Sequence, residues 1–253
     1  MIRVGKVLYD KSGNISYPSL EGYESIVVMM YSHSKYFPLS PYFLTNDNGH
    51  IMENIWQFSK IFENIPAVSV KQSRYNQSII WSHTAETHID DNGNITPGYW
   101  NWRKKGFENK KAVRYPVGYN HRSNCKYSIP EYNLNMKLKY IEARVKIYIP
   151  TYCELAKKET DFFPKLKEKL QNGTNLLILE VDGPHQESLD YYKQNYGVKN
   201  SFIENHTMFV DDENLSIMLN DSKHPFGHGY CLAMALLDID VELLNLWSEI
   251  LNI

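Results

Sequence analysis

Three polar side chains of different chemical type recur at helical spacing in one short segment. Glu53, Gln57 and Lys60 lie four and three positions apart, and at 100° per residue they fall within about 60° of one another on a helix. One helix face would then present a carboxylate, an amide and an amine together, which suits proton transfer beside a positive charge. The opposite face would be apolar and would anchor the helix through Ile51, Ile55, Phe58 and Phe62.

The same segment also has a simpler interpretation. An amphipathic surface helix with a Glu–Lys pair gains only roughly a few tenths of a kcal/mol from that pair. Two neighbouring features favour a cleft instead. Trp56 borders the polar face and would suit a stacking platform, and a Pro-containing aromatic loop with Ser40 and Tyr42 precedes the helix. We expect this loop to form one wall of the cleft.

A second informative segment begins at Asp221 and runs through two glycines into an apolar helix. Gly227 and Gly229 permit close backbone approach, and the N–H groups at the start of a helix favour an anion such as a phosphate. The alternative is an ordinary glycine-containing turn that starts a core helix, because a G-x-G pattern alone is a weak signal.

Other candidate residues carry weaker signals. His83 and His88 lack the carboxylate or cysteine spacing of a metal site, so we expect solvated loop histidines and no metal. Cys125, Cys153 and Cys231 are widely spaced, which favours neither a disulfide framework nor structural zinc. No G-x-S-x-G pattern supports a Ser/His/Asp nucleophile arrangement. An aromatic and basic run could stack on a nucleic-acid strand or form a partly buried patch with a basic rim; it contains Trp100, Trp102, Arg103, Lys104 and Lys105.

The elements that must position these residues follow from hydrophobic periodicity. The pattern predicts strands at 2–8, 24–31, 78–81 and 176–181 and helices at 50–62, 134–152, 161–170, 187–196, 230–237 and 241–251. The run 176–181 is continuously apolar and is followed by a turn at 182–185, which is typical of a buried strand. Pro150 should kink the helix that contains it. The sequence therefore predicts one α+β domain, mostly helical with a small sheet, over residues 1–253.

Composition excludes several classes of protein. A chain of 253 residues with 43% hydrophobic residues, including 19 Tyr, 10 Phe and 5 Trp, can bury a sizeable core and is not disordered. The net charge of −2 gives no overall attraction to nucleic acid. No apolar run reaches the roughly 18–20 residues that cross a bilayer, and the first residues lack a secretory signal. We expect a cytoplasmic protein with no membrane partner.

The two informative segments together resemble the NADAR family. The run from Glu53 to Lys60, ENIWQFSK, is similar to the family's E-H-x-F-Q-x-x-K helix, with Trp56 at the aromatic position. The run GYCLAM from Gly229 is similar to the family's C-terminal G-x-N-x-L-G-x-x-L-M segment. That segment often follows an Asp, for which Asp221 is the nearest match.

The chain also departs from the family pattern. Asn54 stands where the motif has His, and 225–226 are Pro-Phe where the family usually has Lys-Asn. Residues from about 68 to 128, which we expect to carry long loops, and from about 182 to 212 resemble insertions. The resemblance is therefore to a divergent member.

The resemblance implies a NADAR-like fold and hydrolysis of an N-ribosyl bond in an ADP-ribose-related substrate, without a cofactor. The substrate would be ADP-ribosylated guanine in a nucleic acid, or a nucleotide derivative. In that reaction Glu53 would be a general acid/base, Lys60 an electrostatic partner or a Schiff-base nucleophile, and Asp221 would hold ribose hydroxyls or orient Lys60. Trp56 would stack on the base or sugar, and the glycine turn would receive the diphosphate. The implied substrate-binding residues are Trp56, Gln57, Ser40, Tyr42, Gly227 and Gly229.

Two other functions remain open from the sequence. One is a NADAR-like pocket that binds ADP-ribose or a modified nucleotide without turning it over, which the loss of motif residues favours. The other is a nucleic-acid-modifying or anti-defence protein that uses the Trp-rich basic run as a strand platform.

Overall fold

The computed structural model describes residues 1–29, 34–68 and 82–244, and it has two compact units. Residues 1–40 and 149–253 form one of them, called here the sheet unit, and residues 41–148 form the middle unit. Helical residues (41%) outnumber strand residues (19%), and this confirms the predicted mostly helical α+β class. The predicted single domain thus contains two units, and each is described by itself.

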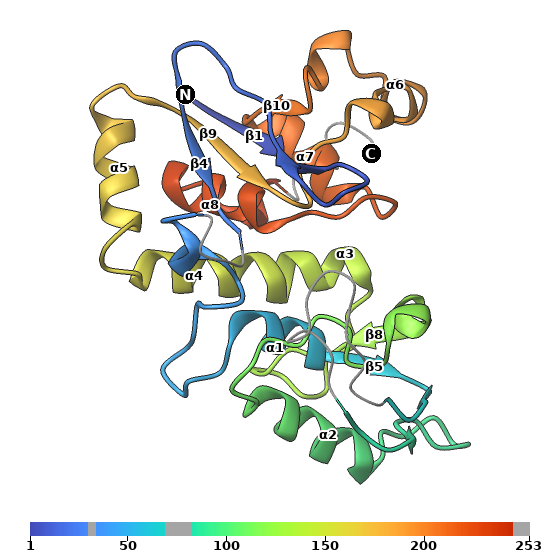
Figure 1. Ribbon diagram of the computed structural model, residues 1–253. Helices are drawn as coiled ribbons and strands as arrows, with labels where there is room; N and C mark the ends of the chain where they lie inside the picture. The colour runs from blue at the N-terminus through green and yellow to red at the C-terminus, as the bar shows by residue number, and fades with distance from the viewer. Residues whose placement is uncertain (30–33, 69–81, 245–253) are drawn as a thin grey trace. The chain divides into compact units, whose positions relative to one another are not determined.

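The sheet unit is built on a mixed four-stranded sheet, visible in Figure 1. Its strands are β1 (Ile2–Lys6), β4 (Tyr23–Val27), β9 (Asn175–Glu180) and β10 (Thr207–Phe209), in the order β10-β1-β9-β4. β9 pairs in parallel with both β1 and β4, while β10 pairs antiparallel with β1. Three of these strands were predicted. The fourth, β10, lies in a segment that resembled an insertion, yet it is an integral edge of the sheet.

The two faces of β9 explain its continuous apolar run, because a parallel central strand is covered on both sides. Leu177 and Leu179 form an apolar cluster with Val7 on one face. On the other face, helix α8 (His228–Leu237) packs against β9 and β1. Glu180 ends the strand with no exposed surface, so a carboxylate is buried where an apolar residue would continue the pattern.

Further helices complete the sheet unit. α4 (Ile149–Lys158) and α5 (Phe163–Gln171) pack against α8 and against each other. The chain reverses after α5 at Gly173, whose φ of 85° is the left-handed conformation that glycine adopts readily. The remaining elements are β2 (Leu8–Tyr9), β3 (Ile15–Ser16), η1 (Phe37–Leu39), η5 (Gln186–Ser188), α6 (Leu189–Tyr196), η6 (Asn200–Phe202) and α7 (Asp212–Asn220).

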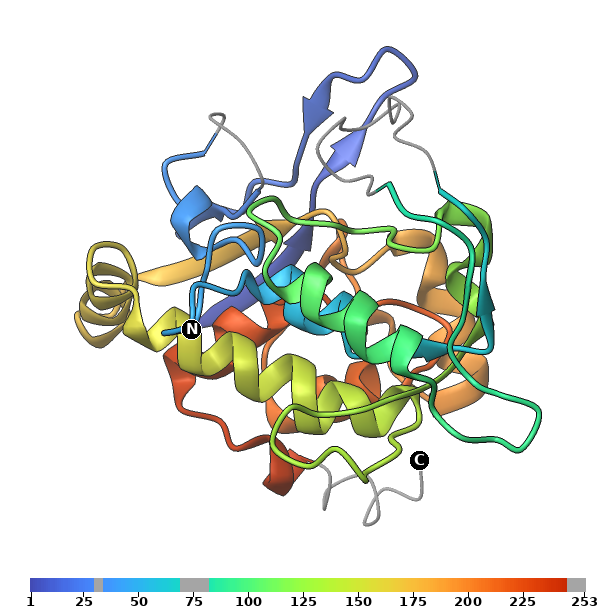
Figure 2. The ribbon, with the colours of Figure 1, turned by 90° about the horizontal axis from the view of Figure 1, so that it is seen from below.

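The middle unit packs two helices over short strand pairs. α1 (Met52–Phe58) lies beside α2 (Pro97–Phe107), as Figure 2 shows. β5 (Lys60–Phe62) pairs with β8 (Cys125–Ser128). The other elements are β6 (Asn64–Ile65), β7 (Glu86–Thr87), η3 (Tyr119–Asn124), α3 (Tyr140–Ala143) and the π-helical η4 (Arg144–Tyr148). The core of the middle unit contains Ile55, Phe58, Ile61, Phe62, Ile65, Tyr99, Trp102, Phe107, Val113, Val117 and Ile129.

Three local predictions for the middle unit were wrong. The helix predicted at 50–62 ends at Phe58, because the chain turns into β5 to join the sheet pair. The region 68–128, predicted as irregular with long loops, contains α2, whose aromatic side chains fill the core. The helix predicted from 134 begins only at Tyr140, since Leu138 is held in a bridge with Ser128.

Pro150 was predicted to kink its helix, and the helix is irregular at that point. Helical turns of π type run from Arg144 to Tyr148, and α4 begins at Ile149, the residue before Pro150. Proline cannot donate the intrahelical hydrogen bond and crowds the preceding turn, and a wider turn is one way in which helices absorb such a residue.

Two further predictions lie partly or wholly outside the described residues. The strand predicted at 78–81 lies entirely within the undescribed stretch 69–81, and most of the helix predicted at 241–251 lies within 245–253. Among the helices that the structure describes, none has the length and apolar character needed to cross a membrane.

Two glycines of α2 give a matched test of the middle-unit core. A Cβ at Gly106 would lie 2.0 Å from Cδ1 of the buried Phe58 ring, whereas at Gly98 the three nearest atoms belong to the flexible Glu86 side chain. We expect Gly106→Ala to lower the free energy of unfolding by about 1–3 kcal/mol through overpacking. Gly98→Ala should stay within about 1 kcal/mol of wild type. Urea denaturation measures both values, and equal stability of the two variants would contradict the packing of α1 on α2.

Candidate functional site

A hydrogen-bonded chain joins the three polar residues first identified in the sequence. The Gln57 side-chain amide donates from Nε2 to Glu53 Oε1 at 2.9 Å, and Lys60 Nζ donates to Gln57 Oε1 at 2.8 Å. Lys60 is the first residue of β5 rather than part of α1, but its long side chain still reaches the helix face. The sequence therefore predicted the grouping correctly, although the local structure differs.

The amide orientation matches the charges at both ends of this chain. The amide N–H faces the carboxylate and the amide oxygen faces the ammonium group, which is the arrangement that stabilises both ionised forms. Glu53 is 5% exposed, and Lys60 is partly buried. Burial lowers the pKa of Lys60, and Arg114 lowers it further, while Cys125 and Glu53 raise it. The net result is an amine whose pKa lies below its usual value.

Trp56 packs inside the middle unit. Its ring lies 5.1 Å from the Tyr148 ring and 6.4 Å from the Tyr140 ring, and Lys60 Nζ lies 4.5 Å above it. Only 8% of Trp56 is exposed. The indole face therefore supports the Lys60 ammonium group by a cation–π contact, and stacking on a substrate stays a prediction that would require these rings to move.

Asn54, which stands in place of the motif's His, has a structural position. It has no exposed surface. Its side-chain nitrogen donates to the carbonyl groups of Asn109 and Lys111, and its side-chain oxygen accepts from Val113 N–H. Asn54 thus fixes the 109–113 segment to α1 and has its amide fully engaged.

The loop residues predicted to line a cleft have different environments. Ser40 has no exposed surface, and its N–H donates to Phe37 O at the end of η1. Tyr42 is partly exposed. Ser40 belongs to the sheet unit and Tyr42 to the middle unit, so their substrate contacts stay a prediction.

Asp221, the third residue predicted to be catalytic, is in the sheet unit and is buried among hydrogen-bond donors. Its carboxylate accepts from the hydroxyl groups of Tyr191 and Tyr192 at 3.0 and 2.8 Å, from Lys223 N–H at 2.8 Å and from His224 Nδ1 at 2.6 Å. Burial raises the pKa of Asp221, but the hydrogen bonds, that of His224 foremost, outweigh it and bring the pKa below its usual value.

The glycines at the start of α8 face a carboxylate of the protein itself. Gly229 N–H donates to Glu180 Oε1 at 2.8 Å. A Cβ at Gly227 would lie 2.2 Å from Glu180 Oε2, and one at Gly229 would lie 2.8 Å from Oε1. Close approach is therefore the structural reason for both glycines. Binding of a diphosphate at this helix end stays a prediction, and it would place a phosphate beside the Glu180 carboxylate.

His228 completes the environment of Glu180. Its Nδ1 lies 3.0 Å from Glu180 Oε2, and its Nε2 lies 2.9 Å from Val28 O. Burial alone lowers the pKa of His228, but the Glu180 charge and these hydrogen bonds raise it above its usual value. The result is a buried ion pair at the carboxyl ends of the parallel strands.

The histidines predicted to be solvated loop residues are not both solvated. His88 has no exposed surface and packs against the rings of Tyr99 and Trp102. Burial, with a small contribution from His83, lowers its pKa to about 4. His83 is partly buried, with Nε2 2.6 Å from Pro116 O. The sequence missed this burial because residues 68–128 were not recognised as part of a core.

The aromatic and basic run belongs to α2, and helical periodicity divides it. Trp102 and Arg103 are 2% and 5% exposed, whereas Lys104 and Lys105 are exposed and Trp100 is partly exposed. The partly buried patch with a basic rim is therefore what the structure contains. Only three of the five side chains remain accessible to a nucleic-acid strand.

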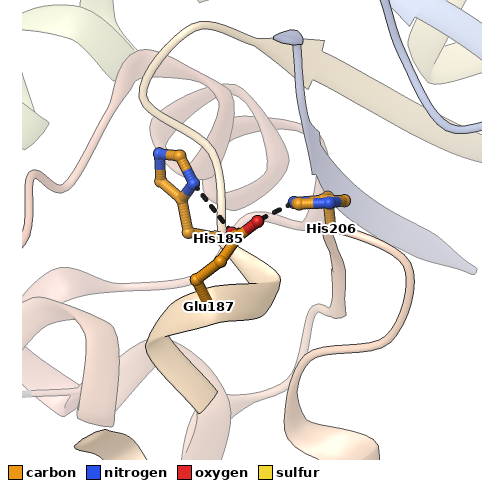
Figure 3. Close-up of side chains that lie close together, drawn as sticks. All are labelled: His185, Glu187 and His206. Carbon is orange, nitrogen blue, oxygen red and sulfur yellow. Dashed lines mark hydrogen bonds and ion pairs between the residues drawn. The ribbon is translucent and has the colours of Figure 1, made fainter.

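A cluster that sequence reasoning missed surrounds the turn after β9. His185 Nδ1 lies 3.3 Å and His206 Nδ1 lies 3.9 Å from Glu187 Oε2, as Figure 3 shows. This set of ligand atoms could hold a metal ion. However, His206 Nδ1 already accepts the Gln186 N–H at 3.2 Å, and the Lys6 charge contributes to lowering the pKa of His185, after burial. We interpret the cluster as polar contacts that hold the η5 turn.

The pKa values of two histidines should be shifted in opposite directions from the ordinary value. We expect His228 to keep its proton above its ordinary pKa of 6.5 and His88 to stay neutral down to about pH 4. The stabilisation from protonated His228 is therefore complete below pH 6.5 and is lost as the pH rises through its folded-state pKa. His88 stays neutral in the folded protein but takes up a proton when it is unfolded, so the protein loses stability as the pH falls from 6.5 towards 4. NMR titration of the histidine ring resonances, assigned with His228→Gln and His88→Gln, measures both values. Titration of both rings near pH 6.5 would contradict these environments.

No protein-family model, curated protein or solved structure matches the chain. The geometry of its own side chains therefore carries the functional argument.

Proposed function

We propose that the protein is an N-glycosidase that hydrolyses an N-ribosyl bond in an ADP-ribose-related substrate, with its reacting groups in the middle unit. The observation that carries the proposal is the chain from the buried Glu53 carboxylate through Gln57 to the Lys60 amine. The resemblance to the NADAR family supports it, because Glu, Gln and Lys occupy matching positions in that family's motif.

Glu53 has the properties that this reaction needs. Departure of the base from ribose leaves positive charge on the sugar, and a carboxylate with little access to water stabilises such charge strongly. The same carboxylate can take a proton from the attacking water. The hydrogen bond from Gln57 to Oε1 fixes the orientation of the Glu53 carboxylate. Glu53 is therefore already oriented for its role as the base.

Lys60 can act in either of two ways. As an ammonium group it balances the charge of Glu53 through Gln57 and offers a positive partner to an anionic substrate. As a free amine, which its lowered pKa favours, it can attack C1 of the opened ribose. That attack forms a carbinolamine, which loses water to give a Schiff base. We assign Asp221 no role in this reaction, because its carboxylate already accepts four hydrogen bonds.

Substitution at either end of the chain tests the activity. We expect Glu53→Gln and Lys60→Met to lower the rate of base release from ADP-ribosylated guanosine by about 100-fold or more, since general acid–base groups contribute on that scale. Chromatography of the released guanine nucleoside and ADP-ribose measures the rate. Glu63→Gln is the matched control, because Glu63 is an exposed carboxylate of the same unit paired with Lys126. Wild-type rates in both folded variants would end the proposal.

Borohydride trapping separates the two roles of Lys60. If Lys60 forms a Schiff base, reduction during incubation with ADP-ribose should leave a covalent adduct on Lys60, identified by peptide mass spectrometry. If Lys60 acts only by its charge, base release continues and no adduct forms. Saturable binding of ADP-ribose by a wild-type protein that releases no base would instead show a binding module without turnover.

A further inference from the structure

A second arrangement of reactive groups lies entirely in the sheet unit. Ser188 Oγ is 3.2 Å from His224 Nε2, and His224 Nδ1 is 2.6 Å from Asp221 Oδ2. A hydroxyl, an imidazole and a buried carboxylate thus form one continuous hydrogen-bonded line. A nucleophile, a base and a group that orients the base have this order in enzymes that work by a serine nucleophile.

The surroundings of Asp221 determine the protonation of this line. Tyr191, Tyr192 and the Lys223 N–H all donate to the carboxylate, so it is stabilised in its ionised form. An ionised carboxylate can only accept, so His224 Nδ1 must carry the proton that it donates at 2.6 Å. In the neutral ring Nε2 then has the lone pair, and the Ser188 hydroxyl donates to it.

The imidazole ring is held in place by more than its hydrogen bonds. Its centroid lies 4.9 Å from the Tyr191 ring and 5.2 Å from the Tyr192 ring. The hydroxyl groups of the same two tyrosines donate to Asp221. Tyr191 and Tyr192 therefore position both the imidazole ring and the carboxylate. The His224 side chain is still 23% exposed, which leaves the base accessible from solvent.

The position of Ser188 suits a nucleophile. It is the N-cap residue of α6, but its side chain makes no capping hydrogen bond and faces His224 instead. Its N–H donates to His185 O at 3.0 Å, and the neighbouring Gln186 is tied to His206 Nδ1 and Ile203 O. η5 leads directly into α6, and the Leu189 N–H donates to Gln186 O, so the backbone on both sides of the Ser188 side chain is held by its own hydrogen bonds.

A cavity lies beside this turn. It has a volume of about 720 Å³, and its lining includes Gln186 and Leu189, the residues on either side of the Glu187–Ser188 pair. Charged and amide side chains dominate the rest of the lining, among them Arg3, Glu21, Glu204 and Asn200. Ser188 and His224 do not line this cavity. It would therefore hold only a part of a substrate that extends past the turn, and its charged lining favours a polar part over a lipid chain.

We propose that Ser188, His224 and Asp221 form a second catalytic site, which hydrolyses esters of small polar acids. Ser188 Oγ attacks the carbonyl carbon while His224 Nε2 takes the hydroxyl proton, and the carbonyl π electrons move to oxygen. The tetrahedral intermediate collapses, the bond to the alcohol oxygen breaks, and His224 protonates the departing alcohol. Water then attacks the acyl-Ser188 ester, giving its proton to His224. Collapse releases the acid, and Ser188 recovers its proton. Asp221 acts as a positioning residue.

A fluorophosphonate probe tests the site in the full-length protein. Ser188 Oγ displaces fluoride from phosphorus only if it is activated, and peptide mass spectrometry then locates the added phosphonate. We expect labelling of Ser188 in the wild type, and a rate about 100-fold lower in His224→Gln, which removes the base. Ser201→Ala is the control, because Ser201 is an exposed serine of the same unit, and its loss should leave labelling unchanged. No phosphonate on Ser188, or equal labelling of wild type and His224→Gln, would overturn the proposal.

Turnover gives a second measurement that does not depend on folding of the histidine variant. Hydrolysis of p-nitrophenyl acetate should show a burst of one nitrophenol per chain, and the burst should disappear in Ser188→Ala. Because the Ser188 side chain makes no capping bond and loses its contact with a His224 ring that is 23% exposed, this variant should have an unfolding midpoint close to that of the wild type. Glu63→Gln, at an exposed carboxylate of the middle unit, is the control and should hydrolyse the ester at the wild-type rate; neither Glu53 nor Lys60 takes part in this reaction. Failure of the N-glycosidase proposal therefore leaves this one standing, whereas an unchanged burst in Ser188→Ala would end it.

Discussion

A carboxylate that is removed from water must be given hydrogen-bond donors, because its desolvation otherwise costs several kcal/mol. Glu180 and Asp221 have no exposed surface, and Glu53 is 5% exposed. Glu180 accepts a hydrogen bond from the start of a helix and forms an ion pair with His228, Asp221 accepts from two tyrosines and a histidine, and Glu53 accepts from an amide. These arrangements determine where the groups of the two proposed sites lie.

In the sheet unit, this constraint holds one segment at both ends. The segment 221–229 begins at Asp221, which ties it to α6 through Tyr191 and Tyr192. It ends at Gly229, whose N–H is bound by Glu180 at the end of the central strand. His224 lies between these two fixed points, so its ring is positioned by the same contacts that satisfy the two carboxylates. The contacts that stabilise the fold therefore also fix the orientation of the imidazole on which the proposed second site depends.

The sequence predicted those features that depend on local pattern. The apolar run of β9 and the helix that became α8 follow from residue spacing within one element, and the grouping of Glu53, Gln57 and Lys60 follows from spacing along a short segment, although Lys60 lies in β5 and not in α1. The features it missed depend on partners distant in the chain. A G-x-G turn before a helix indicates close approach, but not whether the approaching anion is a ligand or Glu180. The contact of Ser188 with His224 could not be predicted, because no local motif marks it and it exists only once α6 and the 221–229 segment have packed.

The two proposed sites differ in how a carboxylate acts on its neighbour. In the sheet unit, Asp221 contacts the imidazole directly and fixes which nitrogen carries the proton. In the middle unit, Gln57 separates the carboxylate from the amine. A direct Glu53–Lys60 ion pair would hold the proton firmly on the amine and raise its pKa. An intervening amide cannot exchange a proton at neutral pH, so it orients both groups while leaving burial to lower the pKa of the amine. In the proposed reaction, this separation would allow Lys60 to act as a nucleophile as well as a charge.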